Sequence, residues 1–228
     1  KSIIGPGCVL DPRQFMKEIS ELEAGGIGTE GKIFIAENTH VITDAHKEED
    51  RKDQKIGTTK RGTGPAYRDK YARVGIRAED VSELKSYLID LYKEFHESPS
   101  TTLRTSPSTT LRTSGPTVLC EGAQGFGLDI DWGDYPYVTS SHCTVGGAIQ
   151  NGIPSKAVRD VWGVAKIYET YVGSKKFETE NPIFRKIREV GEEYGATTGR
   201  PRQCNWLNWN LLEKAVRMNG VTHMVLSK

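Results

Sequence analysis

The stretch SIIGPGCVLDPRQFMKEISELEAGGIGTEGKIFIAE, residues 2–37, decides the fold class of this chain. Its first residues, Ser2 to Ile4, are typical of a short strand. Asp11-Pro12 predicts the start of a helix, because an Asp side chain caps the first amides and Pro suits the first helical turn. Gly25-Gly26 ends that helix, and KIFIAE, 32–37, predicts the next strand. A strand, a helix and a strand in succession indicate parallel strands with a helix packed on them.

The same alternation continues along the chain and predicts an α/β fold with a mainly parallel sheet flanked by helices. The further elements that we expect are a polar helix from Val41 to about Gln54, an amphipathic helix over Val81–Glu97, strands over Thr117–Cys120 and Val161–Tyr168, helices over Pro182–Tyr194 and Trp206–Met218, and a buried strand over Thr222–Lys228.

Composition excludes several classes of protein. The 228 residues include 31 Lys and Arg against 30 Asp and Glu, which argues against a basic nucleic-acid-binding arm. The longest stretch without Asp, Glu, Lys or Arg, Tyr135–Ser155, contains Pro, Gly and Asn, so we predict no membrane span. The four cysteines form no CxxC pair, which favours reduced thiols in a cytoplasmic protein.

Two features set the limits of the domain. The chain opens on Lys1 without a Met and stops on Lys228 at the end of an expected strand, so we expect an internal piece of a longer protein. The octapeptide SPSTTLRT at 98–105 is repeated unchanged at 106–113. Residues 98–114 therefore predict a low-complexity surface insertion, with a phosphorylated Ser/Thr-Pro site as the alternative.

The segment Lys55–Arg77, KIGTTKRGTGPAYRDKYARVGIR, holds seven basic residues and one acidic residue. Glycines allow backbone amides to converge on an anion, Thr hydroxyls add donors, and Lys and Arg neutralise charge. The segment is not a Walker P-loop, because GxxxxGK[ST] is absent. It predicts a phosphate- or carboxylate-binding loop, and a solvated basic loop remains the alternative.

Three later segments repeat this chemistry. EGAQGFGLD, 121–129, follows an expected strand, and its Gln124 offers a donor and an acceptor to a base or amide, with a plain glycine turn as the alternative. YPYVTSSH, 135–142, either binds phosphate through hydroxyls or caps a helix near Thr144. GATTGRPR, 195–202, carries two arginines that can form forked bonds to carboxylate or phosphate, with a helix-capping loop and solvated arginines as the alternative. Together the loops predict a site for a polyanionic ligand, and no metal-ligand spacing accompanies them.

Taken in this order, GTTKRGTGPAYRDKYAR, EGAQGFGLDID, YPYVTSS and GATTGR resemble the adenylosuccinate synthetase family. The resemblance runs from about Ile3 to Lys228, apart from the insertion. It implies a truncated α/β domain over 1–228, related to P-loop nucleotide-binding proteins, in a homodimer. It also implies a ligase that joins L-aspartate to inosine monophosphate (IMP) through a 6-phosphoryl intermediate, with GTP as co-substrate and Mg²⁺ as cofactor.

The family's motifs assign roles position by position. The resemblance implies that Lys70 is catalytic. It implies that IMP is bound by Thr59, Gln124, Thr139, Arg200 and, from the neighbouring subunit, Arg73. It implies that aspartate is bound by Ala196, Thr197, Thr198, Gly199, Arg200, Pro201 and Arg202. It implies that GTP is bound by Arg202 and Lys228.

The chain also departs from the family pattern. The family's general-base Asp, catalytic His and Mg²⁺ ligands are expected outside this chain, so we expect this piece alone to be inactive. The span from Arg73 to Glu121 is short, which resembles the compact form in archaea and some phages. Two alternatives stay open: a related synthetase acting on deoxyguanylate, and a nucleotide-binding remnant without activity.

Overall fold

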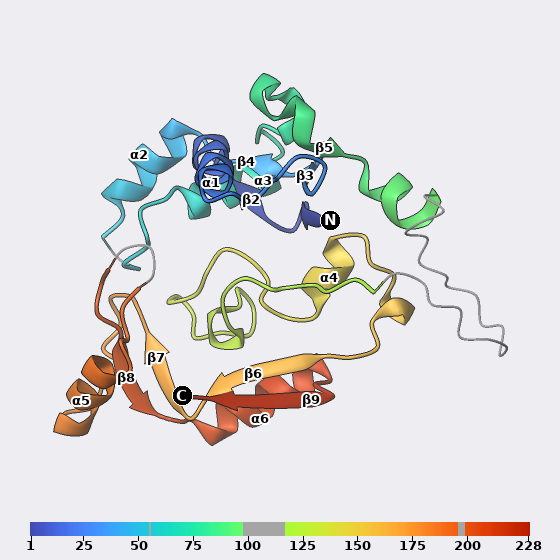
Figure 1. The fold of residues 1–228 in the computed structure, drawn as a ribbon. Helices are drawn as coiled ribbons and strands as arrows, with labels where there is room; N and C mark the ends of the chain where they lie inside the picture. Colours follow the sequence, from blue (N-terminus) through green and yellow to red (C-terminus); the bar gives the residue numbers. More distant parts are fainter. Residues whose placement is uncertain (55, 98–116, 196–198) are drawn as a thin grey trace, which may run out of the picture.

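The computed structural model describes residues 1–54, 56–97, 117–195 and 199–228. The predicted α/β class is confirmed. The elements up to residue 97 lie together in one half of the molecule, and the elements after residue 160 lie together in the other (Figure 1). Residues 117–155 run between the two halves, largely without regular structure. The N-terminus lies in the first half and the C-terminus in the second.

Parallel strands organise the first half. β1 (Ser2–Ile4) pairs with β3 (Ile33–Ala36), which pairs with β5 (Leu88–Ile89). β2 (Val9–Leu10) pairs with β4 (His40–Val41), again in parallel. The predicted strands at 2–4 and 32–37 are confirmed.

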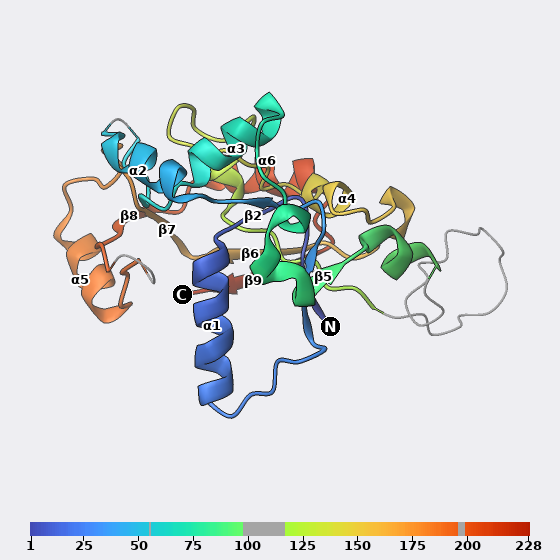
Figure 2. The same ribbon diagram turned by 90° about the horizontal axis from the view of Figure 1, so that it is seen from above.

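The predicted first helix is also confirmed as α1 (Pro12–Ala24), whose N-cap Asp11 accepts hydrogen bonds from the amides of Arg13 and Gln14. Seen from above, α1 extends past the strands on which it packs (Figure 2). Its buried face joins the main hydrophobic core, which consists of Leu10, Phe15, Ile19, Ile35, Val41, Ala78 and Leu84.

Two helices follow β4. α2 (Asp44–Lys52) begins at the N-cap Thr43, where the side chains of Thr43 and His46 form a capping box. The predicted start at Val41 was wrong, because Val41 pairs with Leu10 in the β2–β4 sheet. α3 (Thr63–Ala72) was not predicted. It begins after Gly62 and ends at Arg73, and both residues have left-handed backbone conformations.

The helix predicted over Val81–Glu97 was wrong. The chain forms 3₁₀ turns at Ala78–Asp80 and Ser82–Tyr87, the strand β5, and a π-helical turn at Lys93–Glu97. Leu88 and Ile89 pair with Ile35 and Ala36 of β3, and this non-local pairing overrides the local helical periodicity. Within this segment Leu84 and Phe95 are buried, whereas Tyr92 is exposed.

The segment between the halves contains only short helices: a 3₁₀ turn at Phe126–Leu128, α4 (Gly146–Gln150) and a 3₁₀ turn at Ser155–Ala157. The predicted strand at Thr117–Cys120 was wrong. Its residues are exposed, with Leu119 at 90%, and no neighbouring strand pairs with them among the described residues. The predicted insertion at 98–114 lies outside the described residues.

The second half contains two small sheets. β6 (Trp162–Lys166) pairs in parallel with β9 (His223–Ser227), and β7 (Tyr168–Tyr171) pairs antiparallel with β8 (Gln203–Trp206). The single strand predicted at Val161–Tyr168 therefore divides at Ile167, where the chain passes from one sheet to the other. β9 was predicted correctly as a strand but wrongly as buried: all its residues are exposed, because β6 is its one pairing partner among the described strands.

Helices α5 (Pro182–Val190) and α6 (Trp209–Asn219) complete the second half. Both are shorter than predicted. α5 stops at Gly191, and α6 starts only after the N-cap Asn208, because Trp206 belongs to β8. None of the described helices has both the length and the apolar character needed to cross a membrane.

Candidate functional site

The loop GTTKRG, 57–62, connects α2 to α3 and has an unusual backbone. Gly57, Lys60 and Gly62 have φ angles of 72°, 60° and 82°, in the left-handed region. Thr59 is exposed, whereas Thr58 is half-buried. α3 begins directly after the loop with no side-chain cap and no acidic residue in its first turn. Such a helix N-terminus favours an anion, so the local structure suits a phosphate.

Lys70 lies on α3 and faces the turn between β1 and β2. Its Nζ donates a hydrogen bond to the carbonyl of Pro6, and it lies 5.6 Å from the ring centre of Tyr67. Burial lowers the pKa of Lys70. The Tyr67 hydroxyl donates to the carbonyl of Gly7 at 2.8 Å, so α3 is fixed to this turn at two points.

Arg73 lies at the opposite end of α3 from Thr59, about 15 Å along the helix axis. It is exposed and has a φ angle of 65°. Tyr71, Val74 and Ile76 beside it are also exposed, at 62%, 70% and 46%. The structure therefore does not bring Arg73 together with Thr59 within one chain.

Gln124 and Thr139 lie on two loops that a buried carboxylate joins. Gln124 is exposed, with a φ angle of 69°, and the amide of Thr139 donates to the carbonyl of Leu128 at 2.8 Å. Asp129 is fully buried and accepts hydrogen bonds from the amides of Asp131, Trp132 and Cys143 at 3.0, 3.0 and 2.6 Å. Burial opposes ionisation of Asp129, but these three amides hold its pKa below the usual value.

Arg200 reaches from the GATTGRPR loop to the GTTKRG loop. Its Nη2 donates to the carbonyl of Gly57 at 3.1 Å, across 143 residues of sequence. Gly199 and Pro201 on either side are exposed. Ala196, Thr197 and Thr198, which were also predicted to bind aspartate, lie outside the described residues.

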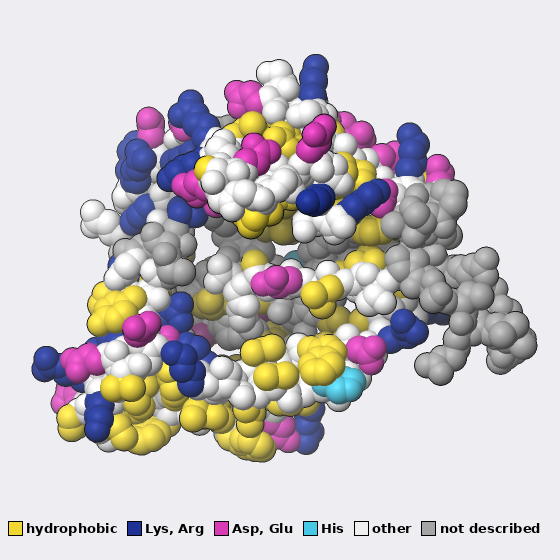
Figure 3. Space-filling view, viewed as in Figure 1, with side chains coloured by type: hydrophobic (Ala, Val, Ile, Leu, Met, Phe, Trp, Pro, Cys, Tyr) yellow, Lys and Arg dark blue, Asp and Glu magenta, His cyan; other side chains and the backbone are white. Residues whose placement is uncertain are grey.

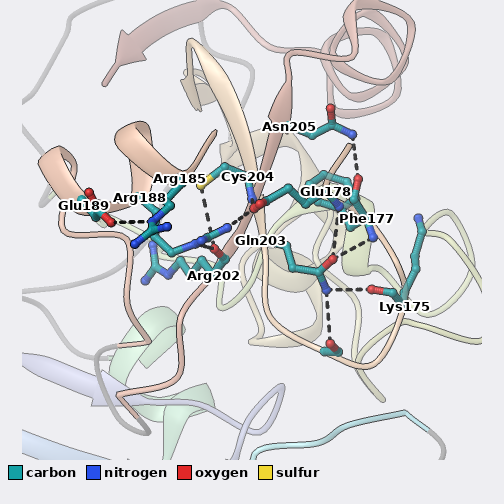
Figure 4. A network of polar contacts seen from close by, with 11 residues as sticks. Lys175, Phe177, Glu178, Arg185, Arg188, Glu189, Arg202, Gln203, Cys204 and Asn205 are labelled. Carbon is teal, nitrogen blue, oxygen red and sulfur yellow. Dashed lines mark hydrogen bonds and ion pairs between the residues drawn. The ribbon is translucent and has the colours of Figure 1, made fainter. Parts of the chain in front are cut away.

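Arg202 is held at three of its atoms. Its Nη1 donates to Oε2 of Glu193 at 2.9 Å, its amide donates to the carbonyl of Glu193 at 2.9 Å, and its carbonyl accepts from Nε of Arg188 at 2.6 Å. Figure 4 shows the third of these supports, from Arg188, continuing to Glu178, which pairs with Arg188 and accepts from the amide of Cys204.

The Glu193 carboxylate accepts hydrogen bonds from several side chains at once. Its buried carboxylate also accepts from Lys166 and, at 2.7 Å, from the hydroxyl of Tyr168. Burial opposes its ionisation, but these donors and the charges of Lys166 and Arg202 hold its pKa below the usual value. Lys228, at the end of β9, lies close by and donates to the carbonyl of Gly191 at 3.1 Å.

Four segments far apart in sequence thus meet around one region. Figure 3 shows the surface hollowed between the first half of the molecule and the loops below it. The contacts that connect the segments are Arg200 with Gly57, the amide of Ser174 with the carbonyl of Ile56 at 3.3 Å, the ion pair of Lys175 with Asp134, the amide of Ile130 with the carbonyl of Ser141 at 3.2 Å, and the close approach of Gly64 to Ser140. The structure therefore brings together the loops of Thr59, Gln124, Thr139 and Arg200.

The sequence of this chain matches a model of the adenylosuccinate synthetase family in two overlapping stretches, residues 1–107 and 92–228. The chain belongs to the adenylosuccinate synthetase family. The family resemblance drawn from the four motifs is therefore confirmed.

Individual members of the adenylosuccinate synthetase family match over the whole chain. The enzymes of Salinibacter ruber and Halothermothrix orenii are both 39% identical to it, over 99% and 100% of this chain and 61% and 62% of their own length. The chain thus spans about 61% of the length of these relatives. The alignment with the Salinibacter protein covers 269 residues, more than the 228 of this chain, so this chain lacks positions within the aligned region.

Two solved structures share the fold. The fully ligated adenylosuccinate synthetase of Plasmodium falciparum superposes with a TM-score of 0.85 at 30% identity, over 99% of this chain and 61% of that one. A succinoaminodeoxyadenylate synthetase of cyanophage S-2L, bound to dGMP and dATP, gives a TM-score of 0.70 at 21% identity, over 98% of this chain and 64% of that one.

Sequence reasoning missed the buried acidic residues behind these loops. Asp50, Asp129 and Glu193 are buried behind the loops, whereas the motifs drew attention to exposed cations and hydroxyls. Their position in the sequence could have indicated them, because each acid lies within about ten residues of a loop rich in Gly, Thr or Arg. A buried carboxylate there can accept hydrogen bonds from backbone amides.

One cluster in the described residues has the composition of a metal site, namely Asp129, Asp131 and His142, whose ligand atoms lie within 4.8 Å of one another. Both oxygens of Asp129 already accept backbone amides. The cluster therefore fits a structural hydrogen-bond centre and does not fit the Mg²⁺ that the family implies.

Proposed function

We propose that this chain forms the IMP- and aspartate-binding part of an adenylosuccinate synthetase. In this reaction O6 of IMP attacks the γ-phosphate of GTP, which gives 6-phosphoryl-IMP and GDP. The amine of L-aspartate then attacks C6 and displaces phosphate, which gives adenylosuccinate. The observation that supports this proposal best is the contact between Arg200 and Gly57, because it joins the loop expected to bind aspartate to the loop expected to bind the nucleotide.

The chemistry demands donors for phosphate oxygens and a clamp for two carboxylates. Thr59 and the N-terminus of α3 offer donors for the nucleotide phosphate, and Gln124 and Thr139 offer further polar contacts. Arg200, with Gly199 and Pro201 beside it, offers a forked guanidinium for a carboxylate of aspartate. We assign Lys70 a catalytic role through the family motif, although its ammonium here faces the carbonyl of Pro6.

Two cations fit the GTP-binding role. Arg202 and Lys228 both approach the turn at Gly191–Glu193, one through the Glu193 carboxylate and the other through the Gly191 carbonyl. They would share the charge of a triphosphate at that place. When bound with GTP, Mg²⁺ neutralises phosphate charge, and none of the described clusters fits it.

We further propose a cytoplasmic homodimer in which Arg73 serves the partner's nucleotide site. The exposed position of Arg73, together with the apolar Tyr71, Val74 and Ile76, supports an interface at this end of α3. A C₂ interface would place the two copies of this surface against each other, so that each Arg73 could cross to the other subunit.

Isothermal titration calorimetry of the chain tests the proposal. We expect binding of IMP, and binding of L-aspartate only when IMP is present. Tighter binding of deoxyguanylate than of IMP would show that the purine is misassigned and would favour the deoxyguanylate synthetase. Failure to bind either nucleotide at millimolar concentration would refute the proposed function.

A further inference from the structure

A buried carboxylate lies directly behind the GTTKRG loop. Asp50, on the last turn of α2, is 4% exposed. It accepts one hydrogen bond from the Thr58 hydroxyl and another from the Gly62 amide, both at 2.7 Å. These two contacts lie near the two ends of the loop, so a single side chain holds the loop at both ends.

The loop needs such support because its backbone is strained. Lys60 is a non-glycine residue with a φ angle of 60°, a conformation that costs on the order of 1 kcal/mol or more. Its amide donates to the Thr58 hydroxyl oxygen at 3.3 Å, and that hydroxyl in turn donates to Asp50. Asp50 and Thr58 therefore stabilise the left-handed turn that presents Thr59.

The two adjacent threonines have opposite orientations. Thr58 is half-buried and bonded to Asp50, whereas Thr59 is exposed. The local structure thus assigns one hydroxyl to anchoring the loop and leaves the other on the surface at the N-terminus of α3.

A second residue of α2, His46, contacts α3 one helical turn before Asp50. Nδ1 of the buried His46 accepts from the amide of Thr43 at 3.0 Å, so the proton of this ring lies on Nε2, which is 3.0 Å from Oδ2 of Asp69 on α3. His46 and Asp50 are four residues apart and lie on one face of the helix. Contacts from α2 therefore fix the positions of both the GTTKRG loop and α3.

We propose that Asp50 is a positioning residue that, through Thr58 and the Gly62 amide, sets the GTTKRG loop in the conformation that binds the nucleotide phosphate. This inference rests on the proposed function, since it takes the phosphate of IMP as the ligand of the loop. Asp50 acts through the loop and not on the ligand, because both its carboxylate oxygens accept hydrogen bonds from the loop.

The test combines IMP titration with hydrogen exchange of the Gly62 amide. Thr58→Val removes the hydroxyl with little change in volume, and Asp50→Ala removes both anchors. We expect each to weaken IMP binding by about tenfold or more, the effect of losing a hydrogen bond to a charged group. Asp50→Ala should also speed exchange at Gly62 by at least about tenfold, because the amide loses its acceptor.

Matched variants separate positioning from general damage. Thr58→Ser retains the hydroxyl and should restore IMP affinity to within about twofold of the unmodified chain. Glu48→Ala, an exposed position on the same helix, should change neither measurement. In the double variant, Thr58→Val should cost little once Asp50 is Ala, because the two residues act through one contact.

Each remaining outcome decides the question. Unchanged Gly62 exchange in Asp50→Ala would refute the anchor. Faster exchange with unchanged IMP affinity would refute positioning and leave a merely structural contact. If the unmodified chain binds no IMP, the proposed function fails and the positioning role fails with it, while the exchange data still report separately on the anchor.

Discussion

Replacing Glu193 with Gln should destabilise the chain measurably at neutral pH. The carboxylate is 3% exposed and accepts from Lys166, Tyr168 and Arg202. A Gln amide keeps one oxygen acceptor but would point its NH₂ group at donors. At least one of the two cations would then lose its acceptor.

The magnitude follows from the exposure of those cations. Removing one partner of a fully buried ion pair costs about 3–5 kcal/mol, because an uncompensated charge stays buried. The Lys166 and Arg202 side chains are 31% and 30% exposed, so water can replace part of what is lost. We therefore expect a loss of about 2 kcal/mol in the free energy of unfolding at pH 7.

The pH dependence provides a second check. Hydrogen bonds and neighbouring cations keep the pKa of Glu193 below its usual value of 4.5 in the folded chain. Its stabilising contribution is therefore fully present above pH 4.5 and is lost as the pH falls through the lowered pKa. The difference between the unmodified chain and Glu193→Gln should shrink in that acidic range.

Urea unfolding at pH 7 and at several acidic values measures both effects. Glu180→Gln is the control, since the Glu180 side chain is 94% exposed and its ion pair with Lys176 should contribute less than about 0.5 kcal/mol. A loss below about 0.5 kcal/mol for Glu193→Gln at pH 7, or a loss that does not depend on pH, would refute the reasoning.

Three further predictions follow from the same structure. Arg200→Leu should weaken L-aspartate binding at saturating IMP by about tenfold or more in calorimetry, with a small change in melting temperature, because it removes a forked donor from a loop rather than from the core; unchanged aspartate binding would reject the loop assignment. Mixing Arg73→Ala chains with Thr59→Ala chains should restore about a quarter of the IMP sites under random pairing, and no recovery in a titration would place each site within one subunit. Leu84→Ala should lower the free energy of unfolding by about 2–5 kcal/mol in urea, because Leu84 is fully buried in the core of the first half; a loss near zero would contradict that packing.

Elements with local signals could be predicted from the sequence, and elements fixed by distant partners could not. α1 has its cap at Asp11 and a glycine at its end, so its bounds were nearly correct. The residues 81–97 have good helical periodicity, yet Leu88 and Ile89 lie next to β3 in space and form a strand there. No local pattern contains that information, because the stabilising hydrogen bonds come from residues more than fifty positions away.

The candidate site likewise has features that the sequence indicates and features that it does not. Gly, Thr and Arg can be recognised by composition, and in the structure a series of contacts connects the loops of Thr59, Gln124, Thr139 and Arg200. The roles of these residues toward ligands stay predictions. Arg73 lies at the far end of α3, where only a second subunit could unite it with Thr59, and a single sequence gives no direct sign of such an arrangement.

The buried acids explain how such cationic loops can hold their shape. Lysines and arginines on one loop repel each other, and glycines make the backbone flexible, so each loop is poorly fixed by itself. In this chain Asp50, Asp129 and Glu193 each place a buried carboxylate behind a loop, and Asp50 and Asp129 accept backbone amides directly. Asp50 accepts the Gly62 amide of a loop that carries Lys60 and Arg61, the Glu193 carboxylate accepts from the side chain of Arg202, and Asp129 fixes the amides of loops that carry no Lys or Arg. The nearly balanced overall charge of +1 is compatible with such loops, because Asp50 and Glu193 compensate charge locally, while the other acidic residues that the structure describes, apart from Glu94 and Asp129, are not buried and spread their charge over the surface.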